Sequence, residues 1–396
     1  MIEKIFKHLK GDRIIWMLIF ILFITSLLAV YSATGMIAYK YHGGNTFYYL
    51  FRHIVFLAIG FIIIYITHRI PYKVYFGSAT IILGTAIVLL AFTLLLGVSL
   101  NEARRWLTIP IIGMEFQTSD LGKFALIVFT SKILSEYQKS DSQLNSAFKI
   151  IMIASMVVGG LILPANLSTT ILLMGTIFIL MFIGRINGKY LLTLIITALV
   201  GLTLFVLIVS NSDTKSRVGT WTTRFQNFAN PESEGNYQVD QSKIAIATGG
   251  FFGKGPGNSV QRNVLPHPYS DFIYAIIIEE YGAIGGIGIL LIYLIILFRT
   301  GIIVRKLDRT FPAFLTIGLV LSLVFQALIN MAVAVNLFPV TGQPLPFVSM
   351  GGTSILFSSI SIGIILNISR YSESKESAQV DEEREYEITD YPFIAG

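Results

Sequence analysis

Asp271 is the residue of this chain whose type and position best suit catalysis. It ends a long polar segment, 210–271, and an apolar run begins directly after it at Phe272. The positive end of a helix dipole favours an ionised carboxylate, and such a carboxylate beside an apolar wall can accept a proton from a hydroxyl. A plain helix N-cap is the alternative. Asp271 is therefore the candidate general base.

Two more carboxylates, Glu279 and Glu280, follow in the same apolar run. In a straight helix they would lie about 12–14 Å deeper than Asp271, at roughly 1.5 Å per residue, which is too deep for the same site. We expect both to be structural partners of a cation or an amide elsewhere in the bundle, and Glu280 to support the site.

A lysine inside an apolar run is the second candidate. The stretch 117–120 is typical of a helix start, with Ser119 or Asp120 as the cap, and Lys123 follows about one turn later. A lysine within a membrane span is costly and marks a functional site by default. The alternatives are an ion pair with Asp120 and a side chain that reaches back to the membrane surface.

Arg104 and Arg105 stand next to each other beside Trp106, in the polar segment 98–120. Guanidinium groups bind phosphate or pyrophosphate oxygens in pairs because their planar fork matches that geometry. Anchoring at lipid headgroups, or pairing with Glu102 or Glu115, explains the two arginines equally well, and the residues alone do not decide.

Further polar residues occur in segments that would surround this site. The glycine-rich run 249–259 departs from the nucleotide-binding pattern, so its glycines are expected to let the backbone approach a bulky ligand. The turn 336–354 holds three prolines and is irregular backbone, which survives at membrane depth only where protein or water satisfies it. The residues expected to support the site are Thr169, Lys254, Asn258, Ser259, Glu280, Ser349 and Gly351.

The elements that must position these residues are membrane spans. Hydrophobic residues make up 54% of the chain and charged residues 13%, about half the charge of soluble proteins. The fold class is therefore an all-α polytopic membrane protein, with about ten spans of roughly 20 apolar residues each. The expected spans are 14–33, 47–67, 74–97, 121–134, 148–163, 167–183, 190–209, 272–298, 313–335 and 350–368.

The distribution of lysine and arginine orients the spans. With the N-terminus inside, the inner connections hold most of the basic residues, so both termini are expected in the cytoplasm and 210–271 becomes one large extracytoplasmic loop. Residues 1–371 would form the membrane domain, and the acidic tail 372–396 would be disordered. The net charge of +6 is scattered over membrane flanks, so no nucleic-acid partner is expected.

Together these segments resemble the SEDS family of cell-wall polymerases (shape, elongation, division and sporulation). The run 255–262 favours the cell-division branch over the elongation and sporulation branches. The family usually has Pro-Ser-Glu at 118–120 and an aspartate where Asn166 stands, so Asn166 receives no acid or base role. The matching stretches are 103–106 (ARRW), 116–123 (FQTSDLGK), 249–259 (GGFFGKGPGNS), 265–275 (LPHPYSDFIYA), 279–282 (EEYG) and 338–352 (FPVTGQPLPFVSMGG).

The resemblance implies a peptidoglycan glycosyltransferase that polymerises lipid II on the outer face of the bacterial cytoplasmic (inner) membrane, at the division septum. Its essential aspartate corresponds to Asp271. The expected partners are lipid II, a class B penicillin-binding protein that supplies transpeptidase activity, and other division proteins. No cofactor is certain, although Mg²⁺ or Mn²⁺ could bridge the pyrophosphate. The residues expected to bind that pyrophosphate or lipid II are Arg104, Arg105, Gln117, Ser119 and Lys123.

Two other function classes stay open. A transporter that flips lipid II without making bonds would also need many spans and charges within them, but the chain shows no internal repeat typical of such transporters. A non-catalytic scaffold for division proteins would tolerate the loss of Asp271 but would not tolerate the loss of its partner surface.

Overall fold

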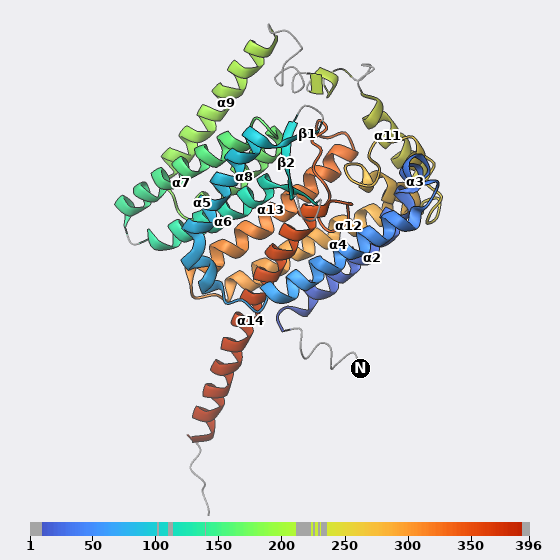
Figure 1. Ribbon diagram of the computed structural model, residues 1–396. Helices are drawn as coiled ribbons and strands as arrows, with labels where there is room; N and C mark the ends of the chain where they lie inside the picture. Colours follow the sequence, from blue (N-terminus) through green and yellow to red (C-terminus); the bar gives the residue numbers. More distant parts are fainter. Residues whose placement is uncertain are drawn as a thin grey trace, which may run out of the picture.

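The computed structural model describes residues 10–100, 103–109, 114–138, 140–210, 223–224, 226–228, 230 and 236–389. In these ranges ten long helices form a bundle, with shorter helical segments beside it (Figure 1). The long helices are α2 (Arg13–Ala33), α4 (Thr46–Thr67), α5 (Tyr72–Leu96), α6 (Thr118–Glu136), α7 (Asp141–Ile162), α8 (Leu167–Ile183), α9 (Gly188–Ser210), α12 (Ile273–Arg305), α13 (Thr310–Ala334) and α14 (Gly352–Thr389). The shorter ones include α3 (Gly35–His42), α11 (Tyr237–Gly249) and the 3₁₀ turn η2 (Gln261–Asn263).

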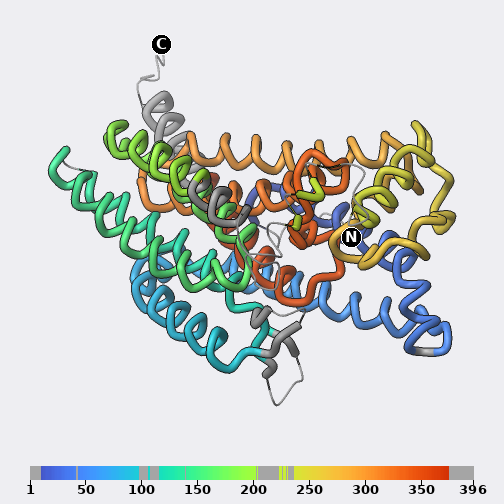
Figure 2. Tube along the Cα trace, turned by 90° about the horizontal axis from the view of Figure 1, so that it is seen from above, coloured from blue at the N-terminus to red at the C-terminus, as the bar shows by residue number. Residues whose placement is uncertain are grey.

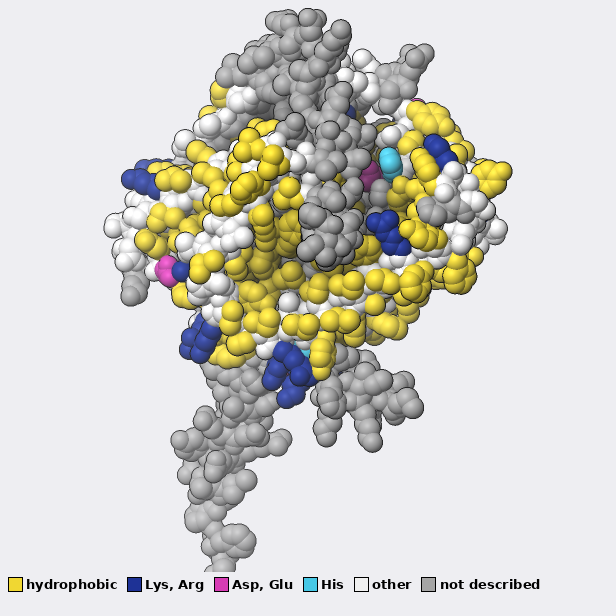
Figure 3. Space-filling model, in the orientation of Figure 1, with side chains coloured by type: hydrophobic (Ala, Val, Ile, Leu, Met, Phe, Trp, Pro, Cys, Tyr) yellow, Lys and Arg dark blue, Asp and Glu magenta, His cyan; other side chains and the backbone are white. Residues whose placement is uncertain are grey.

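Each of the ten predicted spans corresponds to one long helix. Among the described residues, seven helices are long and apolar enough to cross a membrane: α2, α4, α5, α7, α12, α13 and α14. Helices α8 and α9 are apolar but have shorter apolar stretches, and α6 carries Asp120 and Lys123 in its first turns. Hydrophobic side chains cover much of the face in Figure 3. The predicted helical, multi-pass membrane fold is confirmed.

Helices α13 and α14 form the centre of the bundle. In their most apolar windows 61% of α13 and 67% of α14 is buried, against 28% for α4, α5 and α12. Helix α14 packs against α4, α13 and α6, and Figure 2 shows it between the α2–α4 group and the α5–α9 group. Polar side chains on these two helices are therefore held inside protein and away from lipid.

The first and last spans meet at one end of the bundle. The amide of Asp12 donates to Ser369 Oγ at 3.0 Å, and the Asp12 carboxylate caps α2 and pairs with Arg299. Figure 1 shows that α2 begins and α14 leaves at this end. Helix α14 continues beyond residue 371 without a break, and the domain boundary expected there stays a prediction.

A small antiparallel sheet, which the sequence analysis did not predict, lies at the opposite end of the bundle (Figure 1). Its strands are β1 (Val98–Leu100), β2 (Ala103–Ile109) and β3 (Met114–Gln117), in the order β1-β2-β3. Strand β3 runs directly into α6, so the sheet is tied to the helix that carries Lys123.

A break at Gly282 divides α12, and it corrects the expected depth of the two glutamates. Gly282 has φ 70° and ψ −172°, so residues 273–281 form a separate short helix. Ser32, in the last turn of α2, donates to Glu280, whereas Arg299 pairs with Asp12 at the first turn of α2. Glu280 thus lies level with the end of α2, and the prediction that it lies deep in one straight helix was wrong.

Replacing Gly282 by alanine tests this break. A Cβ there would lie 2.2 Å from the carbonyl oxygen of Phe251, and only glycine adopts this backbone region easily. We expect Gly282→Ala to lower the free energy of unfolding by about 1–3 kcal/mol or more, measured as a lower thermal midpoint in detergent. Gly288→Ala is the control, because nothing lies within 4 Å of a Cβ at that position of the same helix. Equal midpoints for the two variants would contradict the role of Gly282.

Candidate functional site

Asp271 lies two residues before α12, and the N-cap position of that helix is Phe272 and not Asp271. The carboxylate is partly exposed and accepts a hydrogen bond from Ser270 Oγ at 3.1 Å. A Cβ placed on Gly342 would lie only 3.7 Å from Asp271 Oδ2, so the turn 336–351 passes directly beside the carboxylate.

Side-chain amides and hydroxyls hold the backbone around Asp271. Asn330 of α13 donates from Nδ2 to the carbonyl of Asp271 at 2.9 Å and to the carbonyl of Gln343 at 2.8 Å. Ser349 donates from Oγ to the carbonyl of Ser270 at 2.6 Å. These three bonds join the segment before α12 to the turn before α14, so Asp271 is fixed from both sides.

The turn before α14 is itself held from α2 and α4. Ser26 Oγ donates to the carbonyl of Val348 at 2.8 Å and lies 2.7 Å from His53 Nε2. Because the Ser26 proton goes to Val348, Ser26 must accept from His53 Nε2–H. Phe347, next to Val348, has φ 63°, a strained backbone position for a bulky side chain. Ser26 and His53 were not predicted as site residues; their signal was a pair of polar residues, Thr25-Ser26 and Arg52-His53, in otherwise apolar runs.

The supporting residues near the turn hold protein groups. Thr169 Oγ1 accepts from Gln343 Nε2 at 2.6 Å, and its own amide is capped by Asn166 Oδ1 at 3.2 Å. Gly351 precedes α14 and its carbonyl accepts from the amide of Ile355 at 3.1 Å. Thr169 is therefore placed to fix the Asp271 region through Gln343.

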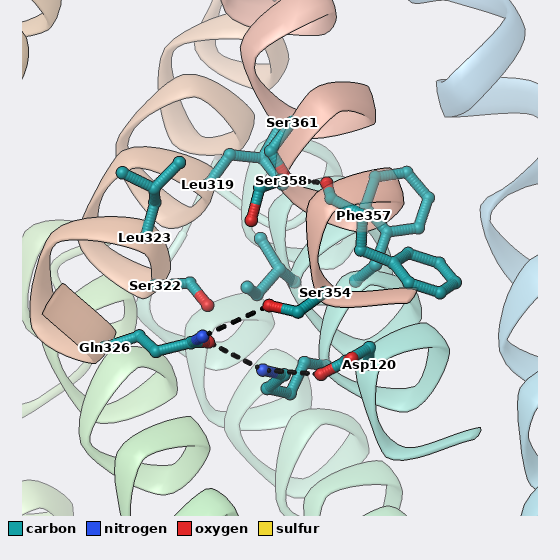
Figure 4. Close-up of a pocket in the computed structure, with 12 residues that line it drawn as sticks. Asp120, Leu319, Ser322, Leu323, Gln326, Ser354, Phe357, Ser358 and Ser361 are labelled. Carbon is teal, nitrogen blue, oxygen red and sulfur yellow. Dashed lines mark hydrogen bonds and ion pairs between the residues drawn. The ribbon is translucent and has the colours of Figure 1, made fainter. Parts of the chain in front are cut away.

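Lys123 points into a pocket between α6, α13 and α14 and is paired there. Its ammonium lies 2.9 Å from Asp120 Oδ1 and 3.0 Å from Gln326 Oε1, and Lys123 is 7% exposed (Figure 4). Ser354 and Gln326 meet across the pocket, with Asp120 below them in Figure 4. The ion pair with Asp120, one of the alternatives for Lys123, is thus present, and the predicted cap role of Asp120 is wrong because α6 begins at Thr118 without a side-chain cap.

One face of α13 connects this pocket with Asp271, which does not line the pocket itself. Gln326 binds Lys123 and also donates to the carbonyl of Pro344 at 3.0 Å, while Asn330 holds Asp271. The two amides are four residues apart, about 6 Å along the helix axis. The acidic and the basic candidate therefore belong to one continuous polar region.

Arg104 and Arg105 lie in β2, and their side chains lie outside the described residues. Trp106 of β2 pairs with Gln117, the last residue of β3. Arg105 is the residue directly before Trp106 and so lies close to the end of β3. Gln117 donates from its side-chain Nε2 to Ser119 Oγ at 2.9 Å. Its backbone N–H donates to Thr353 Oγ1 at 3.4 Å. The predicted binding residues Gln117 and Ser119 thus lie together at the start of α6.

The run 249–263 packs against the first part of α12 and is held there by Glu279 and Glu280. Lys254 Nζ lies 2.6 Å from Glu279 Oε1, Ser259 Oγ donates to Glu279 Oε2, and the Ser259 amide donates to Glu280 Oε1 at 3.3 Å. Asn258 donates to the carbonyl of Lys254 at 3.0 Å. Both glutamates are structural partners as expected; those of Glu279 come from this loop, and Glu280 is also held by Ser32 of α2.

The glycines of this run serve the same packing. A Cβ on Gly249 would lie 2.2 Å from the carbonyl oxygen of Ile278, and one on Gly253 would lie 2.2 Å from that of Glu280. The prediction that the glycines admit a ligand is therefore wrong for these two, which instead admit the backbone before Gly282. In the described part of the chain, no group of three or more Asp, Glu or His side chains could hold a metal ion.

Comparison with known proteins identifies the relatives of this chain. A probable peptidoglycan glycosyltransferase FtsW of Trichlorobacter lovleyi is 32% identical over 93% of this chain and 95% of its own. The stage V sporulation protein E of Bacillus subtilis is 31% identical over 92% of this chain and 99% of its own.

Solved structures show the same fold. A chain from a peptidoglycan synthase complex has a TM-score of 0.70 at 22% identity, over 91% of this chain and 98% of that chain. The rod shape determining protein RodA of Thermus thermophilus has a TM-score of 0.66 at 22% identity, over 91% and 97%. The family model FTSW_RODA_SPOVE, described as a cell cycle protein, matches residues 12–374, so the chain belongs to that family, as the SEDS resemblance predicted.

Proposed function

We propose that this protein is a peptidoglycan glycosyltransferase that polymerises lipid II into glycan strands. The observation that carries the proposal is the partly exposed carboxylate of Asp271, whose backbone is held by Asn330 and Ser349 beside a polar region of the bundle. A base held in place from two directions can meet one hydroxyl in one orientation. The names of the full-length relatives support the same activity.

In this proposal Asp271 accepts the proton of the 4-hydroxyl of the acceptor sugar. The hydroxyl oxygen forms a bond to the anomeric carbon of the donor, and the bond from that carbon to the pyrophosphate breaks. Undecaprenyl pyrophosphate leaves with the electron pair, and the centre inverts from α to β. The pyrophosphate is already a good leaving group, so one base suffices and no second carboxylate is needed as an acid.

The donor pyrophosphate would bind near Arg104, Arg105 and Lys123. Strand β2 is hydrogen-bonded to β3, which continues into α6, and this connection supports a common role for the three cations. Lys123 gives two of its protons to Asp120 and Gln326, so a third can reach a phosphate oxygen. Cations aimed at the leaving group stabilise the charge that develops on it.

The proposed setting is the outer face of the bacterial cytoplasmic membrane, at the division septum. The excess of lysine and arginine in the connections at the end opposite the sheet supports this orientation. The proposed partner is a class B penicillin-binding protein, which would cross-link the strands. The relative whose structure belongs to a peptidoglycan synthase complex, described as coordinating polymerisation and crosslinking, supports that pairing.

Replacing the base without changing its shape tests the mechanism. Asp271→Asn keeps the backbone bonds from Asn330 and Ser349, so we expect a folded protein whose glycan synthesis from lipid II in detergent falls by roughly 10²–10⁴-fold. Asp240→Asn, in an exposed pair with Lys243, is the control. Polymer of near-normal length and rate from the Asp271 variant would exclude the role of base.

The same assay separates the other function classes. Purified protein that makes no polymer from lipid II, with or without its partner, but moves lipid II between the leaflets of vesicles would be a transporter. If neither activity appears and division proteins still bind, the scaffold class would be correct.

A pair of substitutions tests the buried ion pair. Asp120→Asn leaves Lys123 in the bundle without its counter-charge, so we expect it to lower stability by roughly 3 kcal/mol or more. The double variant Asp120→Asn with Lys123→Met should recover most of the thermal midpoint while glycan synthesis stays low, because the cation for the pyrophosphate is missing. Full activity in the double variant would remove Lys123 from the proposed binding site.

A further inference from the structure

A second pocket lies beside the Asp271 region and shares no lining residue with the pocket that holds Lys123. It forms where Arg224, Asn227, Phe228 and residues 236–239 face the turn 336–340, and its volume is about 200 Å³. The side chains that line it are mainly amides and one guanidinium, with Phe228 and Pro339 as apolar walls. The polar ones are Arg224, Asn227, Asn236, Gln238 and Asn336.

The walls of this pocket are built by specific contacts. Arg224 donates from Nη1 to the carbonyl of Val340 at 3.1 Å and so joins the two sides. Asn236, only 7% exposed, donates to the carbonyls of Asn227 and Asn230 at 2.8 and 2.9 Å. Helix α11, which follows, is fixed to α13 because Ser242 Oγ donates to the carbonyl of Ala334 at 2.7 Å.

The pocket adjoins the carboxylate through the turn 336–342. Val340 lines the pocket and also packs in a cluster with Phe272, the residue after Asp271. Gly342, two residues further, passes beside Asp271 Oδ2. Asn336 has φ 59°, the left-handed conformation common for Asn directly after a helix C-cap, and its amide donates to the carbonyl of Val333 at 3.0 Å.

The chemistry of the lining selects a neutral ligand with amide groups. Amide side chains offer both donors and acceptors, and the described residues that line the pocket include no carboxylate. A small, partly open cavity with an aromatic wall and several polar groups suits one sugar ring of a ligand that extends beyond it. We propose that it is a subsite for the N-acetylated sugars of the acceptor, next to the hydroxyl that faces Asp271. This inference rests on the proposed function.

Two substitutions remove amides from the pocket with little effect on its backbone. Gln238→Ala shortens one side chain, and Asn336→Gly removes another while glycine accepts the left-handed conformation. We expect each to raise the KM for lipid II roughly fivefold, the effect of about one lost hydrogen bond, with kcat within twofold. Gln226→Ala is the matched control, because Gln226 is exposed on the same segment and does not line the pocket. An unchanged KM in both variants would overturn the subsite.

A binding measurement keeps this inference separate from the mechanism. Chitotetraose, a soluble N-acetylated sugar oligomer, should bind Asp271→Asn protein in saturation-transfer NMR, and Asn336→Gly in the same background should weaken the signal. This result does not require activity, so it holds even if the role of Asp271 as base fails. No chitotetraose signal in the Asp271→Asn protein would overturn the proposal. A KM effect that disappears with lipid II carrying a shortened peptide would also overturn it, in favour of a peptide site.

Discussion

The structure depends on satisfying irregular backbone inside a bundle of helices. The segment before α12 and the turn before α14 have peptide groups without helical partners, and an unsatisfied peptide group in such surroundings costs several kcal/mol. Asn330, Ser349 and Ser26 supply the missing bonds from α13, from the turn itself and from α2. The side chains that keep the fold intact are therefore the ones that position Asp271, and stability and geometry have the same cause.

Two buried charges inside the bundle are also satisfied by protein groups. Lys123 is buried but neutralised by Asp120, and Glu279 is buried but neutralised by Lys254, so neither group stands alone in a region of low dielectric. Under the proposed function, a diphosphate would have to share the ammonium of Lys123 with Asp120. Asp120 then holds the cation in place while the site is empty, and the lysine need not search for its position when the substrate arrives.

The spans and the main candidates could be predicted, because apolar length and isolated charges are local properties of a sequence. The ten runs and the ion pair of Lys123 with Asp120, three residues apart, are of this kind. The depth of Glu280 could not be predicted, since it depends on the break of α12 at Gly282. At this glycine the carbonyl of Phe251, which is distant in sequence, lies against the backbone. The contacts of Ser26 and Gln343 join residues far apart in sequence, and no local pattern indicates them.

Helix α13 has a geometric consequence for any substrate. Gln326 and Asn330 lie on the same helix, and each binds a different group: the ammonium of Lys123 and the carbonyl of Asp271. The distance between these two side chains along the axis is set by the rise per residue of the helix. It does not depend on the conformation of the connecting loops. A substrate that contacts both places at once must therefore match a fixed distance. A shift of α13 along its axis would move Gln326 and Asn330 together.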